Sequence, residues 1–226
     1  MTECDWLTCA DPRVMLHHLR DHRAASDRQL RLFACACCRA VWDSLIYGAG
    51  QRAVETAERY ADGMATRDDL HRARSRAGAA VSTEVCISIR RRLVRPLDLR
   101  LRLAMEAVHD HQPFLVGRLG AIYVDMELRT AAPDLLRDVV GNPFRPSPPL
   151  APEVRAWNGG LVVPLAQAAY DERQLPAGHL DPVRLAVLAD ALEEAGCADG
   201  ELLCHLRSIG PHVRGCWAVD VILGRS

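Results

Sequence analysis

The chain has 226 residues, 49% hydrophobic content and a formal net charge of −1. This length suffices for one large or two small domains with a real core, and the near-neutral charge gives no global indication of nucleic acid or an anionic membrane as a partner. No stretch reaches the roughly 18 apolar residues of a membrane span, and residues 1–13 lack the apolar region of a signal peptide. We therefore expect a cytoplasmic protein with no membrane partner, whose nine cysteines are mostly reduced.

The first third of the chain carries a series of helix signals. Ser26 and Gln29 form a capping box ahead of the most regular helix, which we expect to end near Gly48. Further helices are expected over 51–61 and after the cap residue Thr66. The apolar face of the helix behind Ser26 consists of Leu30, Phe33, Ala34, Cys37, Val41 and Leu45.

The middle of the chain is ambiguous in type and strongly basic. Residues 85–89 and 97–103 alternate like strands, but the flanking helical signals favour helix. All 28 basic residues of this lysine-free chain are arginine, and residues 72–102 hold nine of them against two acids, a local charge of +7. This segment is the best candidate for nucleic-acid binding, although no aromatic residues interleave with the arginines. The residues expected to contact phosphates are Arg90, Arg91, Arg92 and Arg95.

The alternative is that this basic segment is a solvated face, or that it pairs with an acidic one. Residues 171–201 hold eight acids against two arginines, a local charge of −6. Opposite charges of this size favour contact between the two segments.

A proline-rich connection divides the second half of the chain. A helix is expected to start at Pro133 and to end at Gly141. Residues 142–152 hold five prolines, which predicts a stiff, extended connection and the one plausible internal boundary. Another helix is expected over 161–173.

The C-terminal stretch has the clearest signals for where helices start and stop. Asp181 precedes a proline as an N-cap, and Gly196 stops the helix that follows. Glu193 lies in the last turn, where the helix dipole disfavours it, so we expect an arginine partner. A second helix starts near Asp199 and a third after the Gly210 break. The sequence therefore predicts an all-α protein: a single domain over 1–226, an irregular multi-helix bundle with a proline-rich connection and a short three-helix tail.

Cysteine and histidine spacings suggest a structural metal site. Cys35 and Cys38 are three residues apart on one predicted helix, and His212 and Cys216 are four apart near the C-terminus. Two crossing helices could bring these four side chains into a tetrahedral zinc site. The alternative ligands are Cys37, Cys197, Cys204 and His205. The competing hypothesis is that the cysteines pack as small buried hydrophobic residues, and Cys37 fits it well because it lies on the apolar stripe.

Two weaker patterns point to other chemistry. Cys197 lies just ahead of the helix near Asp199, whose N-terminus would stabilise a thiolate, and His205 follows two turns later. No triad signature accompanies this pair. His109 and His111 form an H-x-H pattern, which suits a metal only on a strand, and exposed polar residues explain it equally well.

Several segments together resemble a paralogous family of uncharacterised planctomycete proteins of the Gemmata type. The resemblance covers both ends of the chain and leaves out residues of about 75–130. Residues 188–207 are also similar, more weakly, to the planctomycete repeat-companion domain. No activity is known for the family, so the resemblance implies no catalytic residues. The matching segments are MTECDWLTCADP at the start, RQLRLFACACCRAVW at 28–42, AVETAERYADG at 53–63, LLRDVVGNPFRP at 135–146, LAQAAYDER at 165–173, LADALEEAGC at 188–197 and HVRGCW at 212–217.

These observations favour a non-enzymatic protein-interaction or adaptor module, stabilised by a structural zinc and bound to another protein. The choice rests on missing catalytic signatures. An arginine-mediated nucleic-acid-binding protein is the first alternative. A cysteine- or metal-dependent enzyme is the second.

Overall fold

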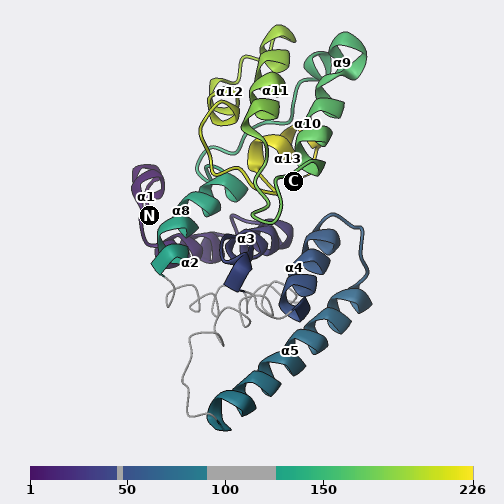
Figure 1. Cartoon of the computed structure of the whole chain (residues 1–226). Helices are drawn as coiled ribbons and strands as arrows, with labels where there is room; N and C mark the ends of the chain where they lie inside the picture. Colours follow the sequence, from purple (N-terminus) through teal and green to yellow (C-terminus); the bar gives the residue numbers. More distant parts are fainter. Residues whose placement is uncertain (45–47, 91–125, 226) are drawn as a thin grey trace. The chain divides into compact units, whose positions relative to one another are not determined.

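Figure 1 shows the chain as a computed structural model, which describes residues 1–44, 48–90 and 126–225. These residues form eleven α-helices and one short 3₁₀ helix, and they contain isolated β-bridges but no strand. The prediction of an all-α, multi-helix protein is confirmed. Among the described helices, none combines the length and the hydropathy needed to cross a bilayer.

The chain divides into two compact units, Met1–Pro133 and Asp134–Ser226. The division falls within a helix and before the proline-rich residues 142–152, which lie inside the second unit. The boundary expected at the prolines stays a prediction.

The first unit begins with short helices whose caps follow the sequence signals. The Ser26 backbone N–H donates to Gln29 Oε1 at 2.9 Å, and the Gln29 N–H donates to Ser26 Oγ at 3.3 Å, as the predicted capping box requires. The described elements are α1 (Glu3–Thr8), α2 (Pro12–His22), α3 (Asp27–Ala40), η1 (Trp42–Ser44), α4 (Gly48–Ala61) and α5 (Arg67–Arg90).

Two boundaries in this unit differ from the predictions. Helix α3 ends at Ala40 rather than near Gly48, because Val41 leaves the helical φ/ψ region. Gly48 instead begins α4, so this glycine starts a helix and does not stop one. Residues 85–89 lie in α5 and are helical as expected, whereas residues 97–103 lie outside the described part of the chain.

The described part of the first unit has a core of apolar side chains and also holds a buried pair of opposite charges. Trp6 and Phe33 are fully buried. The Arg39 guanidinium donates to both carboxylate oxygens of Glu58 at 2.5 and 2.8 Å and lies over the Trp42 ring. Such a bidentate pair keeps both charges satisfied away from water.

The second unit is formed by the end of α8 and five later helices. Helix α8 (Met126–Val140) begins before Pro133, which lies inside the helix instead of at its start. A proline removes one backbone donor but does not forbid the helix around it. The later helices are α9 (Pro152–Gly160), α10 (Val162–Asp171), α11 (Pro182–Glu194), α12 (Gly200–Leu206) and α13 (Trp217–Leu223).

The predicted three-helix tail is α11, α12 and α13. Asp181 and Asp199 cap α11 and α12 with their carboxylates, and Gly196, at φ +84°, follows the end of α11. Arg207 pairs with Glu193 at 2.5 Å, which confirms the expected arginine partner. The third helix starts at Trp217, so residues 211–216 form a loop where the sequence predicted a helix.

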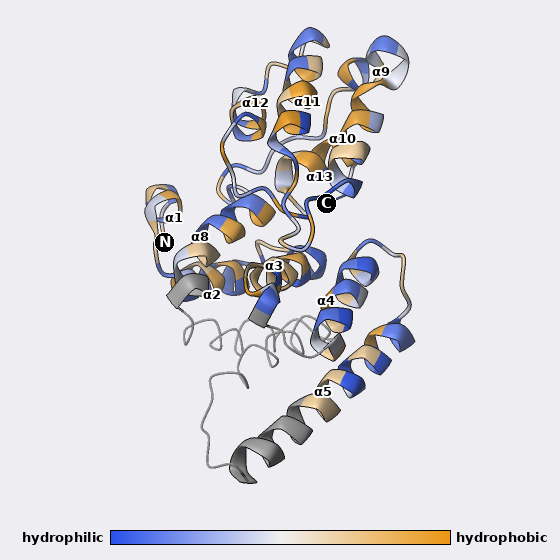
Figure 2. Ribbon diagram, in the orientation of Figure 1, coloured by the Kyte–Doolittle hydropathy of each residue, from blue (hydrophilic) through white to orange (hydrophobic). Residues whose placement is uncertain are grey.

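Helices α9 to α13 enclose one hydrophobic core, to which α10 contributes Ala166 and Tyr170 and α11 contributes Leu188. Figure 1 shows α10 beside both α11 and α13. In Figure 2 these helices carry both hydrophobic and hydrophilic residues, as expected for helices with one buried face. Within the described residues, no side chain of α8 belongs to this core.

Candidate metal centre

Three segments of the second unit bring four potential metal ligands together. Asp138 lies in the last turns of α8, and His205 lies near the end of α12. His212 lies in the loop after α12, and Cys216 is the residue before α13. The Leu180 N–H donates to the His212 carbonyl at 2.8 Å, which ties this loop to the chain ahead of α11.

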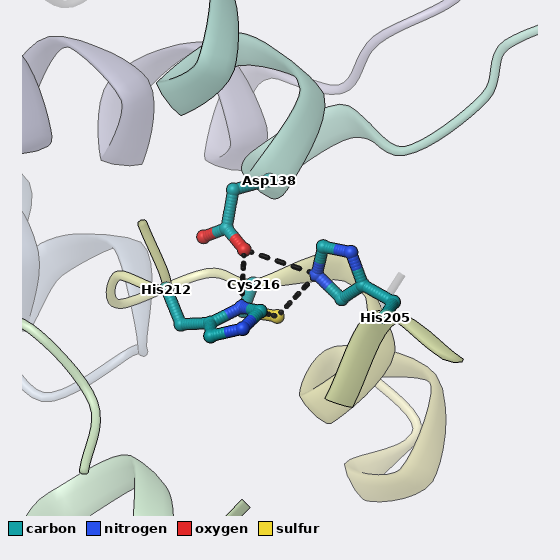
Figure 3. Close-up of side chains that lie close together, drawn as sticks. All are labelled: Asp138, His205, His212 and Cys216. Carbon is teal, nitrogen blue, oxygen red and sulfur yellow. Dashed lines mark hydrogen bonds and ion pairs between the residues drawn. The ribbon is translucent and has the colours of Figure 1, made fainter. Parts of the chain in front are cut away.

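The four side chains converge on one point, as Figure 3 shows. Asp138 Oδ1 lies 3.0 Å from His205 Nε2 and 3.0 Å from His212 Nδ1. Cys216 Sγ lies 3.3 Å from His205 Nε2 and 3.9 Å from His212 Nδ1. All four donor atoms lie within 4.8 Å of one another.

These spacings fit a tetrahedral metal ion. Zinc bonds of about 2.0 Å to nitrogen and oxygen and about 2.3 Å to sulfur separate the donor atoms by roughly 3.3–3.6 Å at the tetrahedral angle. The four distances above, 3.0 to 3.9 Å, bracket that range. The two remaining donor pairs lie within 4.8 Å, so an ion could bind here if the widest pair closed by about an ångström.

The neighbouring backbone orients two of the four ligands. His212 Nε2 lies 3.1 Å from the Ser208 carbonyl oxygen, so a proton on Nε2 leaves Nδ1 with a lone pair toward Asp138 and Cys216. The Val213 N–H donates to Asp138 Oδ2 at 2.8 Å, which leaves Oδ1 facing the histidines. Metal-binding histidines and carboxylates commonly have such outer contacts.

Burial and mutual hydrogen bonds together set the protonation preferences of this cluster. Asp138, His212 and Cys216 are almost fully buried, and the His205 side chain is 20% exposed. Burial opposes ionisation of Asp138, but hydrogen bonds from His205 and His212 outweigh it and hold the pKa of Asp138 below its usual value. Burial also opposes protonation of His212, yet the Asp138 carboxylate raises the His212 pKa. Burial, with the Asp138 charge beside it, raises the pKa of the Cys216 thiol well above its usual value.

No family model, curated protein or solved structure matches this chain. The resemblance to planctomycete proteins stays a prediction. The interpretation of the cluster therefore rests on its own geometry.

The structure brings together two of the four ligands predicted from the sequence. His212 and Cys216 belong to the cluster, and His205 joins them from the alternative ligands. Asp138 was missed, although the sequence holds a signal for it. Asp138 lies three residues after Leu135 and next to Val139, which places its carboxylate on the apolar side of the helix. A charge in that position is disfavoured unless it has a partner, so the pattern indicates a paired or metal-binding carboxylate.

Cys35 and Cys38 lie in the first unit, and neither belongs to this cluster. Both are buried in α3, and Cys35 Sγ lies 3.8 Å from the Val54 carbonyl oxygen. Burial raises the pKa of the Cys37 and Cys38 thiols. These surroundings agree with cysteines packed as small hydrophobic residues. Metal binding by Cys35 and Cys38 stays a prediction.

The remaining candidate residues lie apart from the cluster or outside the described part of the chain. Asp199 caps α12 and accepts hydrogen bonds from the N–H groups of Glu201 and Leu202, so these donors are directed at Asp199 rather than at Cys197. Cys197 and Cys204 lie outside the cluster. Arg90 is the last residue of α5. The candidates outside the described residues are Arg91, Arg92, Arg95, His109 and His111.

Proposed function

We propose that this chain is a non-enzymatic interaction module whose C-terminal unit is held together by a structural zinc ion. The observation that carries the proposal is the direction of the two imidazoles. His205 turns the same nitrogen, Nε2, toward both Asp138 and Cys216, and His212 does so with Nδ1.

This arrangement argues against a cysteine nucleophile at Cys216. A Cys–His–Asp relay needs both nitrogens of one imidazole, one toward the thiol and one toward the carboxylate. Here one nitrogen of each ring faces both groups. Cys216 is also fully buried, and its raised pKa keeps the thiol protonated in the absence of a cation. Four donors that face one point suit a shared cation better than a proton relay.

The donor set favours zinc in a structural role. Two imidazoles, one thiolate and one carboxylate are all zinc ligands, and four protein donors complete a tetrahedral site. A catalytic zinc site keeps one position for water or substrate. The cation would join Asp138 to residues 205–216 and so fasten the end of α8 to the later helices. Helices α9 to α13 share a hydrophobic core to which α8 contributes no side chain.

The interaction role draws support from the loop between His205 and His212. Ile209 lies in this loop and is fully exposed. A zinc ion bound by residues at both ends of the loop would hold this apolar side chain in place for a protein partner. Cross-linking in a cell lysate should therefore give a partner that is lost with Ile209→Asp. Identical cross-linked species from both proteins would contradict this role.

The experiment that tests the zinc site is elemental analysis by plasma mass spectrometry of protein purified without chelators. Wild-type protein should contain about one zinc per chain. Cys216→Ala should abolish stoichiometric zinc, because it removes the one thiolate of the cluster. The double variant Cys35→Ala and Cys38→Ala is the matched control, since it removes two buried cysteines that lie outside the cluster.

The two variants separate the two ligand sets. Zinc lost from Cys216→Ala and retained in the double variant would support the Asp138-centred site. Zinc lost from both would favour the ligands predicted from the sequence. Wild-type protein without any transition metal would refute the proposal.

A further inference from the structure

We propose that Trp217, packed against Gly141, is a cover that controls how fast the metal enters and leaves the site. This inference rests on the proposed zinc site and concerns its exchange kinetics. Trp217 follows the ligand Cys216 directly and is the first residue of α13.

Trp217 lies against the ligand that is nearest to solvent. The His205 side chain is 20% exposed, whereas the Asp138 and His212 side chains are each 2% exposed. The Trp217 ring centroid lies 4.9 Å from that of His205. A metal ion exchanges with solvent one bond at a time, and the most accessible ligand is the easiest to release. His205 is therefore the expected first ligand to leave, and the indole restricts its movement.

Gly141 provides the surface on which the indole packs. A Cβ atom at this position would lie 3.0 Å from Trp217 Cγ and 3.2 Å from Trp217 Cδ2, closer than side chains normally pack. Gly141 also has φ +75°, which suits glycine. It follows α8, the helix that carries Asp138. The indole thus packs on Gly141, three residues after the ligand Asp138, and against the ring of the ligand His205.

A cover and a structural support have different kinetic signatures. A cover that must swing aside slows both entry and release of the ion, so its removal raises both rate constants and leaves the dissociation constant nearly unchanged. A support stabilises only the bound site, so its removal raises the release rate alone and weakens binding by the same factor. The comparison of both rates therefore isolates the role of Trp217.

The experiment measures zinc exchange on the full chain by stopped flow. Release is followed with a chromophoric chelator in excess, and uptake is followed after addition of Zn²⁺ to stripped protein. Trp217→Ala should raise both rate constants severalfold, and Trp217→Phe, which keeps a ring beside His205, should restore most of the slow exchange. Gly141→Ala should resemble Trp217→Ala, because the added methyl displaces the indole.

Matched controls separate the cover from general destabilisation. Gly196→Ala introduces the same change at φ +84°, in the same unit, where nothing lies within 4 Å of the added atom. Trp157→Phe changes another partly buried tryptophan of this unit. Both controls should exchange zinc at the wild-type rates.

Three results would overturn the inference. The first is unchanged rate constants in both Trp217→Ala and Gly141→Ala. The second is a rise in the release rate constant alone in these variants. The third is an acceleration in Gly196→Ala equal to that in Gly141→Ala. If Trp217→Ala fails to fold, the comparison of Gly141→Ala with Gly196→Ala still decides between these outcomes. Wild-type protein that takes up no zinc would refute the site itself, which is a separate result from unchanged exchange.

Discussion

At the residue scale, Asp138 is the side chain on which the cluster depends. Its Oδ1 atom faces both imidazoles, and its Oδ2 atom accepts the Val213 N–H. It is also the one ligand that lies far from the others in sequence. A buried carboxylate with these contacts is costly to replace, because its partners lose both a charge and their hydrogen bonds.

Asp138→Asn should weaken zinc binding by at least about 100-fold, since it removes an anionic ligand and not merely an outer contact. Competition with a chelator of known affinity measures the change. Asp134→Asn is the matched control, because Asp134 precedes Asp138 by one turn of the same helix and is exposed. Equal zinc affinity in Asp138→Asn and wild type would remove Asp138 from the site.

The buried Arg39–Glu58 pair gives a second prediction at this scale. Arg39→Met leaves the Glu58 carboxylate buried without its bidentate partner, so the free energy of unfolding should fall by about 3–5 kcal/mol. Arg72→Met, which breaks an exposed pair with Asp69, should cost about 0–1 kcal/mol. Denaturant titration measures both. Similar losses in the two variants would show that the buried pair is not a special contributor to stability.

At the scale of the element, helix caps position the ligands. The Asp199 carboxylate accepts the N–H groups of Glu201 and Leu202 and so starts the short helix α12, which carries His205. A seven-residue helix is marginal by itself, so its cap and its packing decide whether it forms. Asp181 caps α11 in a similar way, but α11 carries no ligand of the cluster.

Asp199→Ala should therefore lower the free energy of unfolding by about 1 kcal/mol and also weaken zinc binding. Asp181→Ala should cost a similar amount of stability and leave zinc affinity unchanged. Thermal unfolding and chelator competition on the two variants measure the two quantities separately. Equal effects on zinc affinity would mean that α12 does not position His205 through its cap.

At the scale of the whole molecule, the candidate metal site belongs to one of the two compact units. Its ligands come from α8 and from residues 205–216, while the first unit has a separate buried core. A ligand that binds only the folded state stabilises the part of the chain that binds it. The effect of zinc should thus be local.

Zinc removal should increase amide hydrogen exchange at residues 134–141 and 205–216 and leave α3 and α4 protected. The physical reason is that the cation joins two segments which otherwise meet through a few buried polar contacts. Hydrogen-exchange mass spectrometry with and without a chelator measures this. A uniform increase along the described helices would instead indicate that the two units unfold together.

The sequence by itself determined the local features of this protein. These features are the Ser26–Gln29 capping box, the Asp181 and Asp199 caps and the apolar stripes. Each depends on neighbours within about one helical turn, so the sequence alone predicts them. Only the tertiary structure decided which cysteines and histidines meet. Asp138 lies 67 residues from His205 along the chain, and no local pattern links such residues. The sequence could pair His212 with Cys216 by spacing, but only packing joined them to Asp138 and His205. Packing also buried Cys35 and Cys38, which belong to α3 and lie outside the cluster.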